Sequence, residues 1–248
     1  MFGWFRPSCP VEPHAKLWVE ERLAWLSDQF GRDLFVRRAV IQPIEEFFPA
    51  PYDRSFDAVQ VLFEQVCRYM DVDSDRVGLR FFAGGNPLYL EDDRGHAIST
   101  GPAGLYEEDG MRTLIHLETS QFHEPEELVG TMAHELAHVR LLGEGRADPD
   151  IFDNELLTDL TVVYHGLGIF MANSPRAWLS DFSHWPETEA PRPEYMTMPM
   201  FGYALAHAAW FRREESPAWA KHLHPDARAT FYHSLKYLRK TGDSTFRP

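Results

Sequence analysis

Two histidines and a glutamate stand at a spacing that suits metal-dependent hydrolysis. The stretch His134-Glu135-Leu136-Ala137-His138 has the form His-Glu-x-x-His. Residues i and i+4 of a helix share one face, so His134 and His138 could present two imidazole nitrogens to one zinc ion. Glu135 could act as general base toward a water molecule at an open coordination position. The spacing therefore predicts a catalytic zinc site.

The residues around this motif favour a helix that would position it. Pro125 suits the first helical position, and Glu126 and Glu127 complement the helix dipole in the first turn. Apolar residues at spacings of four, four and three indicate a core-facing stripe: Leu128, Met132, Leu136 and Val139. Gly143 and Gly145 indicate the end of the helix. A surface helix with two solvated histidines is the alternative interpretation.

A second pair of acidic residues follows at helical spacing. Glu155 and Asp159 stand four residues apart, and the segment continues to residue 170 with mostly apolar residues, which predicts a buried helix. Because a buried carboxylate needs a partner, zinc is predicted as the partner of Glu155, its third protein ligand. Asp159 could accept a hydrogen bond from a zinc-binding histidine. Alternatively, Glu155 merely complements the helix dipole, with Asp153 or Asn154 as N-cap.

Together the two motifs resemble those of the gluzincin metallopeptidases, the thermolysin-like branch of the zincins. That family has Asn-Glu-x-x-Ser-Asp after His-Glu-x-x-His, and this chain has Asn154-Glu155-x-x-Thr158-Asp159, with Thr in place of Ser. The resemblance covers residues 110–172 and implies that both histidines and Glu155 bind zinc. It also implies that Glu135 is the base and that Asp159 supports a zinc-binding histidine. The short linker between the motifs is similar to that of compact minigluzincins.

An α+β, zincin-like fold is expected for the whole chain. Residues 1–248 are predicted to form a single domain, with an N-terminal α+β part (1–124) that contains a small mixed sheet. The mainly helical part (125–248) would carry the zinc motifs, with the active-site cleft between the parts. Strands are expected at 34–42, 77–82 and 112–117, and a glycine-rich loop at 94–110. In zincins an edge strand commonly receives the peptide by strand addition, so the resemblance implies this role for residues 113–117. Alternatively, they form an ordinary sheet strand.

Peptide hydrolysis also needs a donor for the developing oxyanion, which gluzincins supply from a His or Tyr of the helical part. Tyr203 and His207 stand four residues apart in an otherwise apolar helix and are the candidates here. The alternative is a core tyrosine and a hydrogen-bonded histidine. Further candidates are His116, His123 and His165.

The amino-acid composition limits the classes of partner and the cellular location that are expected. The chain has 24 basic and 38 acidic residues and a formal net charge of −14, so neither nucleic acid nor anionic membrane is expected as a partner. The two cysteines, Cys9 and Cys67, are far apart in sequence and in no metal-type spacing. A disulfide framework is therefore not expected, which suits a reducing compartment. The sequence shows no apolar signal segment and no stretch of about 18 apolar residues. A cytoplasmic location is therefore predicted, and the oligomeric state is left open.

These features predict a zinc metallopeptidase with one catalytic Zn²⁺, which hydrolyses peptide bonds by zinc-activated water with Glu135 as general base. Its substrate would be a peptide or protein. The alternative is a zincin-fold regulatory or binding protein with restricted or no turnover. A purely structural zinc ion would need a fourth protein ligand, and the sequence indicates three.

Overall fold

The computed structural model describes residues 7–83, 90–91, 97–98, 104–109, 112–174 and 183–247. The chain forms two compact units, one made of Met1–Gln42 and Pro149–Pro248 and the other of Pro43–Asp148. Helices and strands are both present, so the α+β prediction is confirmed at this level. The units divide at residues 43 and 149 rather than at 125, and the single domain stays a prediction.

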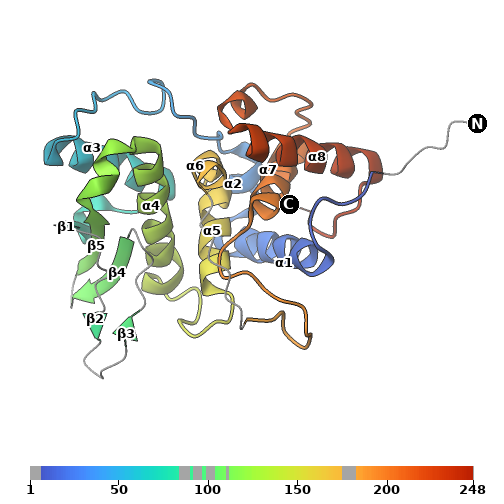
Figure 1. The fold of residues 1–248 in the computed structure, drawn as a ribbon, viewed down its shortest axis with the longest axis horizontal. Coiled ribbons are helices and arrows are strands. Elements are labelled where there is room, and N and C mark those ends of the chain that lie inside the picture. Colours follow the sequence, from blue (N-terminus) through green and yellow to red (C-terminus); the bar gives the residue numbers. More distant parts are fainter. Residues whose placement is uncertain are drawn as a thin grey trace, which may run out of the picture. The chain divides into compact units, whose positions relative to one another are not determined.

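The Pro43–Asp148 unit combines a small mixed sheet with helices (Figure 1). Its three-stranded sheet has the order β1-β5-β4, in which β5 is parallel to β1 and antiparallel to β4. The strands are β1 (Val77–Phe82), β4 (Gly104–Asp109) and β5 (Arg112–Glu118), and a separate antiparallel pair is β2 (Leu90–Glu91) and β3 (Ala97–Ile98). The helices are α3 (Phe56–Met70) and α4 (Pro125–His138), which pack against each other, with single turns η1 (Ser74–Arg76) and η2 (Thr119–His123).

Strand β5 lies in the centre of its sheet, so the prediction of an edge strand at 113–117 is wrong. Leu114 is opposite Gly78 on β1 and opposite Glu107 on β4. A strand paired on both sides has no free edge for strand addition. The second neighbour, β4, comes from the glycine-rich stretch that the sequence indicates is a loop. The alternation in β5 shows a strand, but it does not show how many neighbours the strand has.

The other unit is helical. It contains α1 (Pro13–Phe30), α2 (Arg32–Arg37), α5 (Asn154–Tyr164), α6 (Gly168–Asn173), α7 (Met198–Phe211), η4 (Ala218–His222) and α8 (Pro225–Thr241). Helices α7 and α8 lie side by side (Figure 1), and a Cβ on Gly202 of α7 would come within 2.9 Å of Thr230 Cβ on α8. Helix α5 packs against α1, α6 and α7, so it lies in the core of this unit. None of the helices in the described part of the chain combines the length and apolarity needed to cross a bilayer.

The strand predicted at residues 34–42 is wrong, because residues 32–37 form helix α2. The Arg212 guanidinium donates hydrogen bonds to the carbonyl oxygens of Phe35 (2.8 Å), Val36 (2.8 Å) and Arg38 (2.5 Å). Carbonyls at a helix end lack intrahelical partners, and here a distant side chain provides them. The β-branched residues of this stretch favour a strand. The contact with Arg212 could not be predicted from them, because Arg212 lies 174 residues after Arg38 in the sequence.

The helix predicted to run on to residue 170 is interrupted. Helix α5 ends at Tyr164, and Gly166 adopts φ +93° before α6 begins at Gly168. A Cβ on Gly166 would lie 2.6 Å from the carbonyl oxygen of Ala39, so this close approach requires glycine. The Gly166 carbonyl in turn accepts a hydrogen bond from the Ile41 N–H at 2.9 Å. The break thus fixes the C-terminal end of the helix that carries Glu155.

Candidate metal centre

Helix α4 carries the His-Glu-x-x-His motif on a buried surface. It begins at Pro125, as predicted, and every residue from Leu128 to His138 is buried. The His134 and His138 rings lie with centroids 4.9 Å apart and planes 83° to one another, so they share one face as their spacing predicts. Glu135 is 3% exposed, which excludes the alternative of a solvated surface helix.

The C-terminal end of α4 is held in place directly after His138. A π-helical turn, Val139–Gly143, follows the helix. Within it the Arg140 guanidinium donates to the Asp71 carbonyl at 3.0 Å and to the Glu144 carboxylate at 2.7 Å. Asp71 caps the C-terminus of α3. Single π-helical turns often occur at functional sites, and this one ties the end of the histidine helix to its neighbour.

Helix α5 carries the two predicted acidic residues. Glu155 is half-buried in the first turn, and Asp159 is buried one turn later. Asp159 Oδ2 accepts a hydrogen bond from the Met196 N–H at 2.9 Å. Thr158, the residue that differs from the family motif, donates its hydroxyl to the Asn154 carbonyl at 2.8 Å, so it contacts its own helix. The role of Asp159 toward a zinc-binding histidine stays a prediction.

His134, His138 and Glu155 form a group that could hold a metal ion, because their donor atoms all lie within 4.8 Å of one another. Two imidazoles and one carboxylate are the protein donors of one class of catalytic zinc site, in which the fourth position is left for water or substrate. Their distances and chemistry thus fit zinc. Three ligands and a neighbouring carboxylate, Glu135, could support hydrolysis.

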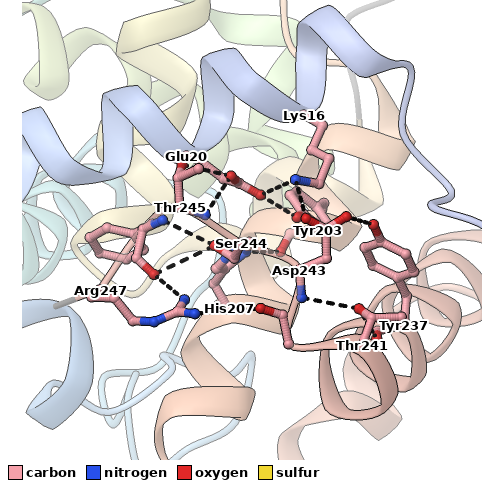
Figure 2. Close-up of polar contacts among 12 residues, drawn as sticks. Lys16, Glu20, Tyr203, His207, Tyr237, Thr241, Asp243, Ser244, Thr245 and Arg247 are labelled. Atoms are coloured by element: carbon pink, nitrogen blue, oxygen red, sulfur yellow. Dashed lines mark hydrogen bonds and ion pairs between the residues drawn. The ribbon is translucent and has the colours of Figure 1, made fainter.

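Tyr203 and His207 lie instead in a buried network of α1, α7 and the C-terminal segment (Figure 2). The Tyr203 hydroxyl donates to Glu20 at 2.6 Å, and burial followed by this contact raises the pKa of Tyr203. His207 Nδ1–H donates to the Tyr203 carbonyl at 3.0 Å, and Ser244 donates to Nε2 at 2.9 Å. Both side chains are 0% exposed. This is the alternative of a core tyrosine and a hydrogen-bonded histidine, so we omit both from the catalytic set proposed below.

The remaining histidine candidates have other surroundings. His165 is fully buried, and its Nδ1 hydrogen-bonds the Thr161 carbonyl of the preceding turn at 2.9 Å. His116 is buried on the central strand β5, and His123 is exposed at the end of η2. None of these three histidines is included in the catalytic set proposed below.

Burial of His207 predicts a pH-dependent stability. Burial lowers the pKa of His207 to about 4. Between pH 6.5 and 4 the unfolded chain therefore binds the extra proton, so stability falls as the pH falls through this window, by about 2 kcal/mol at pH 5. We expect His207→Gln to be less stable at pH 7 but to lose less stability between pH 7 and pH 5. Urea denaturation at several pH values measures this, and parallel profiles for both proteins would exclude His207 as the source.

Sequence reasoning missed the residues that hold α5 at its start. Asp153, one of the two N-cap residues named in the alternative interpretation, stands at the N-cap position, but its side chain pairs with Trp18 and Arg22 of α1. An aspartate before a helix is usually interpreted as an N-cap. Its pairing with another helix becomes visible only in the structure.

Comparisons of the chain with protein-family models, with curated protein sequences and with solved structures find no match.

Proposed function

We propose that this protein is a zinc-dependent metallopeptidase with a zincin-like, gluzincin-type active site. The observation that supports this most is the grouping of the His134, His138 and Glu155 donor atoms within 4.8 Å, next to the buried carboxylate Glu135. Two histidines alone occur in many contexts. A third donor of the right type, from a motif 17 residues further along the chain, makes a catalytic zinc site the best explanation.

Each of these residues would have a distinct role in the reaction. His134, His138 and Glu155 hold the ion, which when bound supplies a Lewis acid that polarises the scissile carbonyl and acidifies water. The Glu135 carboxylate takes a proton from the attacking water as its oxygen bonds to the carbonyl carbon. The same carboxyl group then gives the proton to the amine nitrogen as the C–N bond breaks. Asp159 would orient one of these histidines by accepting a hydrogen bond from its other ring nitrogen, and so would set its tautomer.

The substrate class and location are parts of the same proposal. A peptide or protein substrate follows from the reaction that this set of residues performs in zinc peptidases. A cytoplasmic location is proposed because the chain has only two cysteines, far apart in sequence, so that a disulfide framework is not expected. Substrate entry by strand addition to β5 is not part of the proposal, because that strand is paired on both sides.

Removing and restoring the metal tests the proposal. Purified protein treated with a strong chelator should lose hydrolysis of a peptide library, and one equivalent of zinc should restore it. Magnesium, a poor ion for two imidazoles, is the matched control and should not restore it. Hydrolysis that persists in metal-free protein, or that never appears in zinc-loaded protein, would contradict the proposed function.

A further inference from the structure

We infer that Trp18, Arg22 and Asp153 form a clamp that positions Glu155 for metal binding, an inference that rests on the proposed function. These three residues, called the Asp153 clamp below, join α1 to the start of α5. Their role would be to hold Glu155 in position, and none of the three would itself be a metal ligand. They do not contact the metal or the substrate in this account.

The clamp has the geometry of a strong, fixed contact. Trp18 Nε1–H donates to Asp153 Oδ2 at 2.6 Å. Arg22 donates from Nε to Oδ2 at 2.7 Å and from Nη2 to Oδ1 at 2.9 Å. Both carboxylate oxygens are therefore engaged in a bidentate arrangement, which fixes orientation as well as distance. Asp153 is 0% exposed, so water does not compete for these bonds.

The position of Asp153 in the chain connects the clamp to Glu155. Asp153 is the N-cap residue of α5, and its carbonyl accepts the first helical hydrogen bond from Leu157 N–H at 2.8 Å. An aspartate here normally caps the helix with its side chain. Within the described chain its side chain forms no such cap bond, because it faces α1 instead. The first turn of α5, which contains Glu155 two residues after Asp153, is thus held in place by α1.

Neighbouring contacts hold the same region. The Arg22 and Arg192 guanidinium carbons lie 5.9 Å and 5.6 Å from the ring centroid of Phe152, the residue before Asp153. Trp185 lies next to Trp18, with ring centroids 6.3 Å apart. These contacts add to the hydrogen bonds of the clamp, one set at Phe152 just before Asp153 and the other at Trp18. The first turn of a helix tends to fray, and the clamp would hold this turn and the half-buried Glu155 in place.

Stability alone is a weak explanation for this contact. A buried ion pair loses much of its Coulomb energy to desolvation, and well-packed apolar residues often serve as well. A bidentate pair instead specifies geometry, and metal ligands must be held within about 0.5 Å of their working position. Supporting residues of this kind commonly contribute 10- to 100-fold to metal affinity. The clamp fits that use, because its central residue stands two positions from the predicted ligand.

Variants that keep the fold but loosen the clamp test this inference. Arg22→Lys keeps the charge and loses the planar fork, and Trp18→Phe keeps an aromatic ring and loses the N–H donor. The matched control is Tyr164→Phe, at the opposite end of α5. The Tyr164 hydroxyl donates a hydrogen bond of 2.9 Å to the carbonyl of Gly31, the residue that follows α1. Zinc dissociation constants come from competition with a chromophoric chelator, and stability from urea denaturation of the metal-free proteins. The visible spectrum of the Co²⁺-substituted proteins reports the ligand geometry.

We expect Arg22→Lys and Trp18→Phe to weaken zinc binding about 10- to 100-fold and to shift the cobalt bands. Tyr164→Phe should lower the denaturation midpoint but leave zinc affinity within about twofold, since Glu155 lies at the other end of the helix. Unchanged affinity and spectra in both clamp variants would overturn the inference, as would an equal loss of affinity in Tyr164→Phe. Wild-type protein that binds no zinc would overturn the proposed function itself, and this inference with it.

Discussion

Replacing Glu135 with glutamine should lower peptide hydrolysis about 10²- to 10⁴-fold while zinc still binds with one equivalent per chain. Glutamine has nearly the same shape, but it cannot take the proton from the attacking water. The loss should appear in kcat, because the carboxylate acts on the reacting atoms and not on the bound peptide. Steady-state kinetics with a fluorogenic peptide, together with a zinc titration of the same sample, measures both quantities.

Glu127→Gln is the control for this result. Glu127 lies on the same helix and loses the same charge, but it is exposed in the first turn. Its variant should keep wild-type kinetics within about twofold, since exposed charges in a first turn contribute only modestly to the helix. If Glu135→Gln hydrolysed peptide at the wild-type rate, Glu135 would not be the general base.

Removing any one of the three proposed ligands should cost more zinc affinity than loosening the residues behind them. We expect His134→Ala, His138→Ala and Glu155→Ala to exceed the 10- to 100-fold losses that supporting residues show. They should also abolish the increase in melting temperature that zinc gives the wild-type protein, because that increase depends on affinity for the folded state. Chelator competition and thermal denaturation with and without zinc measure the two effects.

An exposed histidine separates ligand loss from general effects. His123 lies at the end of η2, five residues before the buried run of α4 begins, and His123→Asn should bind zinc like the wild type. Glu155→Ala is the most informative of the ligand variants, because the alternative role of Glu155 is only to complement the dipole of α5. A variant that retained wild-type zinc affinity would restrict Glu155 to that role.

The local features of the site were predictable because they depend on short spacings. The i, i+4 pairs of both motifs and the proline at the start of α4 encode which side chains share a face. The apolar stripe predicted that Leu128, Met132 and Leu136 face the core, and all three are buried. The burial of Asp159 followed in the same way from the apolar run of α5.

Most of the errors came from contacts that are distant in sequence. Arg212 converts a stretch of strand-forming residues into α2, and the Ala39 carbonyl requires the glycine that ends α5. The edge-strand error is different, because β5 pairs with β4, which directly precedes it in the chain and begins at a glycine within the stretch that the sequence predicts as a loop. Tyr203 and His207 have the spacing of a functional pair, but Glu20 and Ser244 occupy their hydrogen-bonding atoms. No window of a few residues contains this information.

The Asp153 clamp shows the same limit from the functional side. Trp18 and Arg22 stand four residues apart on α1, which indicates one helical face, but their partner lies 131 residues beyond Arg22. The sequence indicates an N-cap, and the structure shows that the Asp153 side chain instead joins the start of α5 to α1. Such supporting residues lack a motif because many different side chains could provide the same geometry.

The most direct test is to titrate metal-free protein with zinc while zinc binding and peptide cleavage are followed in the same sample. The account predicts that both rise together and reach their limits at one zinc per chain. Zinc binding that saturates at one equivalent without any cleavage product would contradict a peptidase and favour a binding or regulatory protein. Cleavage that does not change with zinc would contradict the metal site as its source.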